Sequence, residues 1–184
     1  MEGLLNQLRL DHINFIRLLN LLEVDILALE SGGQADYLRM KDIMKYMINY
    51  PDAFHHPCEE ILFEKLHDLD REDAATVDKL HSEHAILADL GQKAAELLDK
   101  TIAGQIVSKE DIVNAASEYK DLLRIHLVTE ERKIFPLIES SLEPADWDDA
   151  VARTGNLSDP IFSGPVADEY RQLFESISRK EEAG

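Results

Sequence analysis

Two segments of the sequence pair a histidine with a glutamate four residues later. The pairs are His55 with Glu59 and His126 with Glu130, and a second glutamate follows each of them. Residues four apart lie on the same face of an α-helix, so each imidazole and its carboxylate can reach one ion. Neutral imidazole nitrogens and carboxylate oxygens are ligands of iron, manganese, zinc and cobalt. The alternative interpretation is an ordinary ion pair on a helix surface.

The same residues interrupt apolar seams. Apolar residues spaced alternately by three and four form the stripe through which a helix packs in a bundle. Six residues with metal-binding side chains occupy positions in such stripes: His12, His55, Glu59, His84, His126 and Glu130. Burying an ionised glutamate alone costs a large free energy. Two buried glutamates beside four histidines therefore predict an internal cation.

Four long helices would position these side chains. The periodicity predicts helices over residues 3–30, 36–67, 72–103 and 109–141, with Gly32-Gly33, Gly104 and a cap at Ser108 as boundaries. Short connections between four helices predict an all-α, up-down-up-down four-helix bundle. In that topology the depths of the four histidines along their helices agree within about one turn, so the ligands converge on one layer.

Three neighbouring residues are additional candidate ligands. His56 lies about 100° around the helix from His55, but a kink at Pro57 could rotate His56 inward together with Glu60. His81 faces inward in one of two phasings of its helix, whereas His84 faces inward in both. We therefore retain His56, Glu60 and His81 as alternatives. Prolines at 51 and 136 should kink or interrupt their helices in the same way.

The composition of the chain changes at about residue 143. Prolines break up the segment that follows, which contains the single tryptophan, Trp147. Short helices are predicted at 145–153 and 166–180. We expect residues 1–142 to form the bundle and residues 143–184 to form a short helical extension packed on it, because about 40 residues are too few for an independent core.

The charge and the cysteine content exclude several classes of partner. The 184 residues carry a net charge of −18, which disfavours nucleic acids and anionic membrane surfaces. The single cysteine, Cys58, allows no intrachain disulfide, and the first residues lack the pattern of a signal peptide. We expect a cytoplasmic protein with no membrane partner, and a homodimer stays open.

The chain resembles the hemerythrin-like HHE cation-binding family over residues 4–141. Four motifs carry the resemblance: Asp11-His12, HHPCEEILF at 55–63, SEH ending at His84, and HLVTEERKIFP at 126–136. The resemblance implies a four-helix bundle with two non-haem irons, bridged by carboxylates and by an oxo or hydroxo group. The same ligands also suit zinc or manganese in vitro.

Carried over by position, the resemblance implies six metal ligands: His12, His55, Glu59, His84, His126 and Glu130. Glu59 and Glu130 would be the bridging pair. Hemerythrin itself has a His-x-x-x-His pair on its third helix, whereas His81 and His84 are only three residues apart here. The seventh ligand is left open between His81, His56 and a water. An open coordination position favours reactive chemistry over simple reversible oxygen carriage.

The expected function is engagement of a small diatomic ligand, O2 or NO, for sensing, scavenging or repair of iron centres. Candidates to support the ligands by hydrogen bonds are Asp11, Tyr119 and Glu131. One alternative is a di-iron oxidase or peroxide-handling enzyme; another is an iron-responsive regulatory or interaction module. A ferritin-like site is disfavoured, because the required Glu-x-x-His spacing occurs only at Glu64 and His67. Whether the chain is an enzyme stays open.

Overall fold

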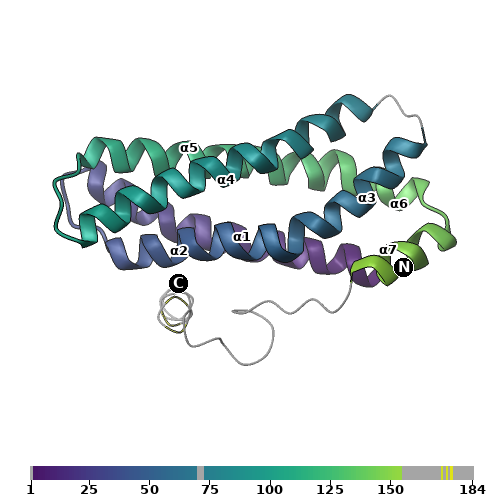
Figure 1. Ribbon diagram of the computed structural model, residues 1–184, viewed down its shortest axis with the longest axis horizontal. Helices are drawn as coiled ribbons and strands as arrows, with labels where there is room; N and C mark the ends of the chain where they lie inside the picture. Colours follow the sequence, from purple (N-terminus) through teal and green to yellow (C-terminus); the bar gives the residue numbers. More distant parts are fainter. Residues whose placement is uncertain (1, 70–72, 155–170, 172, 174, 176–184) are drawn as a thin grey trace.

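The computed structural model describes residues 2–69, 73–154, 171, 173 and 175. These residues form helices and no strands, which confirms the all-α prediction (Figure 1). The helices are α1 (Glu2–Glu30), α2 (Tyr37–Tyr50), α3 (His56–Asp68), α4 (Ala74–Ile102), α5 (Lys109–Thr129), α6 (Phe135–Ser141) and α7 (Pro144–Thr154). Two π-helical turns, η1 (Pro51–His55) and η2 (Glu130–Ile134), join α2 to α3 and α5 to α6. The predicted helix at 166–180 lies largely outside the described residues.

Local sequence signals set the helix boundaries. Gly32 and Gly104 adopt positive φ angles of 76° and 77° just after α1 and α4, a conformation that glycine adopts without steric cost. The Ser108 side chain accepts a hydrogen bond from the Glu110 amide and caps α5, as predicted. Asp36 caps α2 in the same manner by accepting from the Arg39 amide.

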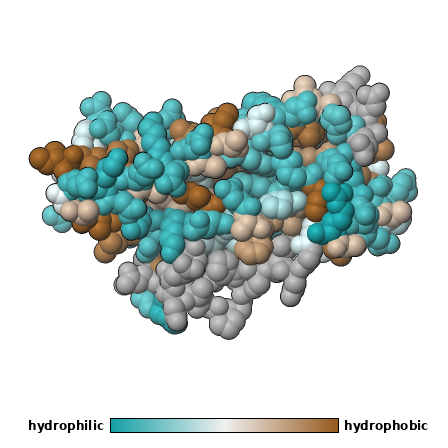
Figure 2. All heavy atoms as spheres, in the orientation of Figure 1, coloured by the Kyte–Doolittle hydropathy of each residue, from teal (hydrophilic) through white to brown (hydrophobic). Residues whose placement is uncertain are grey.

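The long helices lie side by side, and ion pairs show how neighbouring helices are aligned (Figure 1). Arg9, near the start of α1, binds Glu139 of α6 with two hydrogen bonds of 2.7 and 3.0 Å. Glu23, near the end of α1, accepts from Lys120 in the middle of α5. The chain from α5 to α6 therefore runs opposite to α1. Hydrophilic side chains cover most of the face seen in Figure 2, as the acidic composition leads one to expect.

Prolines explain the two π-helical turns. Pro57 and Pro136 have no N–H, and their rings crowd the preceding turn. In both places the residue before the proline donates its amide across a widened turn, from His56 to the Pro51 carbonyl and from Phe135 to the Glu130 carbonyl. The predicted interruption at these prolines is thus one turn of π-helix in each case. Such turns are frequent at functional sites.

The apolar core consists of two clusters separated along the bundle axis. One cluster contains Phe15, Leu87 and Leu123, and the other contains Leu8, Leu62 and Ile134. Trp147 of α7 is buried in the second cluster, and α7 also pairs with α3 through Lys65 and Asp149 at 2.8 Å. The division into a 1–142 unit and a 143–184 extension stays a prediction.

Candidate metal centre

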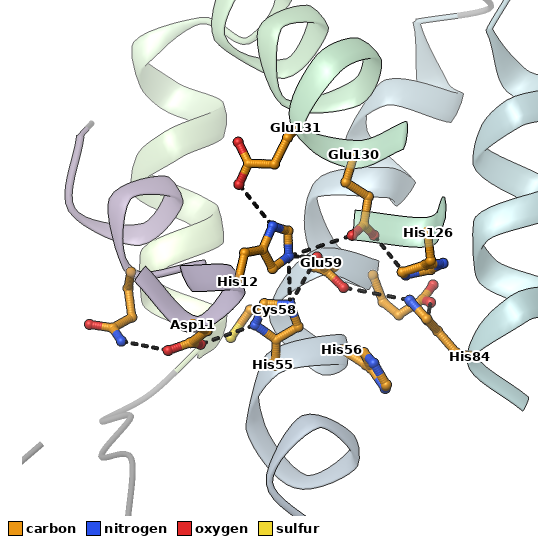
Figure 3. A network of polar contacts seen from close by, with 12 residues as sticks. Asp11, His12, His55, His56, Cys58, Glu59, His84, His126, Glu130 and Glu131 are labelled. Atoms are coloured by element: carbon orange, nitrogen blue, oxygen red, sulfur yellow. Dashed lines mark hydrogen bonds and ion pairs between the residues drawn. The ribbon is translucent and has the colours of Figure 1, made fainter. Parts of the chain in front are cut away.

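Six buried polar side chains lie between the two apolar clusters, where the sequence placed them. His12 comes from α1, His55 from the last residue of η1, Glu59 from α3, His84 from α4, His126 from α5 and Glu130 from the first residue of η2. Figure 3 shows the four imidazole rings arranged around the two carboxylates. All six residues are at most 9% exposed. The structure therefore brings the six predicted residues into one layer.

Their potential ligand atoms form two groups, each with a diameter suited to one ion. His12, His55 and Glu59 offer atoms within 4.8 Å of one another, and so do Glu59, His84, His126 and Glu130. Within the groups, His55 Nε2 lies 3.1 Å from Glu59 Oε1, and His126 Nε2 lies 3.0 Å from Glu130 Oε1. Glu59 belongs to both groups, with one oxygen toward each. This arrangement suits a carboxylate shared between two cations.

The carboxylate oxygens of this layer lie near imidazole nitrogens but make no hydrogen bond in the described structure. Both oxygens of Glu59, both oxygens of Glu130 and Nε2 of His84 are buried without a partner among the described residues. Polar atoms buried without a partner are rare in proteins because each costs about 1–3 kcal/mol. A cation would satisfy these five atoms together. The donor set thus fits the metal that the sequence predicts.

Each of the four histidines has a carboxylate on its opposite ring nitrogen. The Nδ1 atoms of His12, His55, His84 and His126 lie 2.8–3.0 Å from Glu131, Asp11, Glu60 and Glu83 respectively. A carboxylate that accepts from Nδ1–H leaves the Nε2 lone pair directed at the centre of the site and makes it more basic. The same pairing of an imidazole Nδ1 with a carboxylate therefore occurs four times, and the four carboxylates come from α1, α3, α4 and η2.

Asp11 and Glu131 lie against candidate ligands, as the sequence suggested. For two other residues, Tyr119 and Glu83, the structure differs from the sequence-based expectation. Tyr119 donates instead to the Met47 carbonyl, 3.3 Å away, and contacts no candidate ligand through its hydroxyl. Glu83 was missed, although its position three residues after Leu80 and four before Leu87 marks it as inward-facing. Helical spacing alone could have identified it.

The three additional candidates lie outside both groups of ligand atoms. The His56 ring stacks on His84 with centroids 4.0 Å apart, and its Nδ1 lies 3.0 Å from Asp52. The His81 side chain is 67% exposed and contacts Glu60 at 2.7 Å, because α4 follows the phasing that buries Leu80 and Leu87. Glu60 supports His84. These residues surround the His84 side of the site and do not complete either group.

The electrostatics without metal depend on two histidine–glutamate pairs. Burial opposes protonation of His55, but the charge of Glu59 and the hydrogen bond to Asp11 outweigh it and raise the His55 pKa to about 10. Burial likewise opposes protonation of His126, and Glu130 raises the His126 pKa to about 9. Burial and the charge of Glu59 raise the pKa of Glu130. Protons and metal ions therefore compete for the same site.

A small cavity adjoins the candidate ligands on the side of the larger apolar cluster. Its volume is about 10 Å³, and its walls include Phe15, Leu87, Leu123, Leu127, His55 and His126. This is about the space that one water-sized molecule needs. The walls are mainly apolar, so the cavity suits a small uncharged molecule beside the ligand layer.

Cys58 remains a packing residue, because burial raises its thiol pKa to about 12.

Replacing Glu83 with glutamine is expected to weaken metal binding by about 10- to 100-fold without unfolding the protein. The amide cannot hold the His126 imidazole as a carboxylate does, and Glu83 is not among the grouped ligand atoms. Titration of the metal-free protein with Fe²⁺ under anaerobic conditions measures the effect. The exposed Glu96 on the same helix provides the matched control, Glu96→Gln. Equal affinities for the two variants would contradict the supporting role.

Comparison with protein families agrees with this geometry. Residues 3–138 match the family described as the hemerythrin HHE cation binding domain. A search of curated proteins finds no match, and a search of solved structures finds none either. The matched range includes all six grouped residues and all four supporting carboxylates. Because it spans well over half of the chain, the protein belongs to the hemerythrin HHE cation-binding domain family.

Proposed function

We propose that the protein is a di-iron protein that binds or reacts with O2 or NO. The main support for the proposal is the position of Glu59. Its two oxygens belong to two adjacent groups of buried ligand atoms. The proposed ligands are His12, His55, Glu59, His84, His126 and Glu130, with Glu59 and Glu130 shared between the ions. Neutral histidines and carboxylates suit iron, although zinc and manganese would bind the same atoms.

The proposed scaffold is an up-down-up-down four-helix bundle. The opposite directions of α1 and the α5–α6 segment support it, as does the pair of Arg39 in α2 with Asp25 in α1. No described helix combines the length and the apolar character that crossing a membrane requires. We include a cytoplasmic address in the proposal, since the single cysteine gives the chain no use for an oxidising compartment.

Bound iron would supply the electrons and the open coordination position that a diatomic ligand requires. The chain's own residues prepare that position. His12, His55, His84 and His126 hold their Nε2 atoms toward the centre because carboxylates engage their other nitrogens. Phe15, Leu87 and Leu123 keep the adjoining cavity apolar. The cavity has room for about one molecule of the size of water.

One observation favours a second candidate, a di-iron oxidase or peroxide-handling enzyme. His81 on the surface contacts one oxygen of Glu60, and the other oxygen of Glu60 contacts Nδ1 of His84. This chain of contacts joins solvent to a candidate ligand, and reduction of O2 or peroxide consumes protons. Under this alternative, a His81→Ala variant would bind metal and NO normally but would turn over peroxide more slowly.

Metal analysis and spectroscopy test the proposed function. Protein purified anaerobically after iron-replete growth should contain about two irons per chain, the number set by the two ligand groups. Its absorption spectrum should change on exposure to air and, separately, to NO. His126→Ala should lower the iron content, whereas the matched variant of an exposed histidine, His67→Ala, should retain it. Folded protein without iron, or a His126→Ala variant with full iron content, would refute the proposal.

A further inference from the structure

Helix α1 exposes one narrow stripe, and this stripe has the spacing of a coiled-coil seam. The exposed positions follow one another at alternate steps of four and three: Asn6, Leu10, Ile13, Arg17, Asn20, Val24 and Leu27. The remaining residues between them are buried or partly buried. A helix at a protein surface normally directs polar residues to water. Here four of the seven positions are large and apolar.

These apolar side chains are substantially exposed. Leu10, Ile13, Val24 and Leu27 are 45–56% accessible to solvent. On the adjacent helix α5, Ile125 and Val128 are exposed by 57% and 46%. Together these six account for nearly half of the thirteen large hydrophobic residues that are exposed in the described part of the chain. Such concentration on one face marks an interaction surface.

From Leu10 to Leu27 the stripe is symmetric about a point between residues 18 and 19. When the stripes of two copies are placed antiparallel, Leu10 of one copy lies opposite Leu27 of the other. Ile13 then lies opposite Val24, and Arg17 lies opposite Asn20. Each apolar position therefore faces an apolar position, and arginine faces an amide rather than another arginine. An interface with twofold symmetry needs this property, because the same patch must complement itself. Antiparallel coiled coils likewise pair the two alternating positions of the heptad with each other.

From this symmetry we propose that the protein forms a homodimer in which the α1 helices of two copies pack antiparallel along this stripe. Ile13 then contacts Val24 of the partner subunit, and Leu10 contacts Leu27 of the partner subunit. The exposed faces of α5, with Ile125 and Val128, flank the helix pair. The stripe lies on the outer surface of the bundle, and none of its residues is a candidate metal ligand.

A groove between α1 and α5 supports a second copy as the occupant. It has a volume of about 500 Å³, and Ile13, Ile16, Leu127 and Val128 form its apolar walls. In the antiparallel arrangement, Val24 and Leu27 of the partner subunit lie over this groove. Apolar side chains are thus available to fill it on both sides of the twofold axis.

The charges at the ends of the groove agree with the same occupant. Arg132 and Arg9 line the groove where α1 begins, and Arg9 is also paired with Glu139 of its own chain. In the antiparallel pair, that region receives the carboxyl-terminal end of the partner's α1, which carries the exposed Glu30 of the partner subunit. The end of a helix also bears a partial negative charge. Opposite charges therefore meet at both ends of the interface.

The groove also contains His12 and Glu131. These residues form the hydrogen-bonded pair, 2.8 Å apart, that supports the His12 side of the candidate metal centre. The dimer would cover this pair and shield it from solvent. The pair is partly open because the Glu131 side chain is 35% exposed, whereas His12 is already buried.

Light scattering coupled to size-exclusion chromatography tests the proposal on the full chain. The wild-type protein should have twice its chain mass of 20.9 kDa. Ile13→Glu and Val24→Arg should each raise the dimer dissociation constant by roughly thirtyfold or more, because each places a charge opposite an apolar side chain. An equimolar mixture of the two variants should recover the dimer, since residue 13 of one copy faces residue 24 of the other. Ile86→Glu, at a 49% exposed position on α4, is the matched control and should remain dimeric.

Three results would overturn the proposal. The first is a wild-type chain that is monomeric at about 50 µM, well above the dissociation constants typical of stable dimers. The second is an Ile86→Glu variant that dissociates as strongly as Ile13→Glu. The third is recovery of the dimer by mixing Ile13→Glu with Ile13→Arg but not with Val24→Arg, which would indicate parallel helices. Circular dichroism confirms that each variant is folded.

Discussion

Replacing Glu59 with glutamine is expected to remove most of the metal from the protein. Glu59 is the residue that belongs to both groups of ligand atoms, so the change affects both proposed ions. A neutral amide oxygen is a much weaker ligand than a carboxylate, and the loss should exceed the roughly hundredfold effect of a supporting residue. Elemental analysis of anaerobically purified protein measures it. The exposed Glu64 on the same helix provides the matched control, Glu64→Gln.

The same substitution should also destabilise the metal-free protein near neutral pH. The charge of Glu59 favours the protonated form of His55, whose Nε2 lies 3.1 Å away, and this pair stabilises the fold when no cation is bound. Glutamine has nearly the same shape but no charge, so it leaves the buried imidazole without its counter-charge. We expect the free energy of unfolding at pH 7 to fall by about 1–3 kcal/mol. A variant that keeps its metal, or whose metal-free form is as stable as the wild type at pH 7, would contradict the assigned role.

Metal-free protein is expected to become less stable as the pH rises, over the range in which metal binding becomes stronger. The pKa values of His55 and His126, about 10 and about 9, exceed the unfolded value of 6.5. Protonation of these histidines therefore stabilises the fold fully below pH 6.5, and this contribution is lost as the pH rises through 9 and 10. At about 1.4 kcal/mol for each pH unit between the unfolded and folded values, the total loss is at most about 8 kcal/mol.

Bound metal needs neutral imidazoles, so the stabilisation that metal provides should increase over the same range. The difference in Tm between metal-loaded and metal-free protein should be larger at about pH 8.5 than at about pH 6.5, by roughly 4–8 °C. Thermal unfolding under anaerobic conditions at the two pH values measures this difference. His55→Gln should flatten the pH dependence of the metal-free protein, whereas His67→Gln should preserve it. A difference in Tm that is constant or decreases with pH would refute the competition between protons and metal.

Much of the fold could be predicted from local signals. The alternating steps of three and four in α1 bury Leu8, His12 and Phe15 because helix geometry alone decides which residues share a face. Glycines and a capping serine marked where the helices begin and end, because those preferences depend on backbone conformation and on nearby donors. The same periodicity identified the six candidate ligands. Their metal and its chemistry stay predictions.

Two features depended on more than local sequence. The proline positions predicted an interruption, but not that a π-helical turn would absorb it at both His55 and Glu130. One extra residue in a turn rotates the side chains of the following helix by about 100° around its axis. The spacing of residues alone therefore does not determine which of those side chains point into the bundle. The phasing of α4 was ambiguous for the same kind of reason. It was resolved by the packing of Leu80 and Leu87 against neighbouring helices.

The sequence by itself determined which side chains enter the bundle, because each helix selects its buried face from its own periodicity. The tertiary structure alone decided which of them meet. His12 finds Glu131 across 119 residues and His126 finds Glu83 across 43, and no local spacing relates such partners. Contacts of this kind depend on how far one helix is rotated and shifted against another. The relative rotation and shift of the helices are determined only when their apolar faces pack. This packing brings the inward-facing residues and their hydrogen-bond partners together as a candidate metal centre.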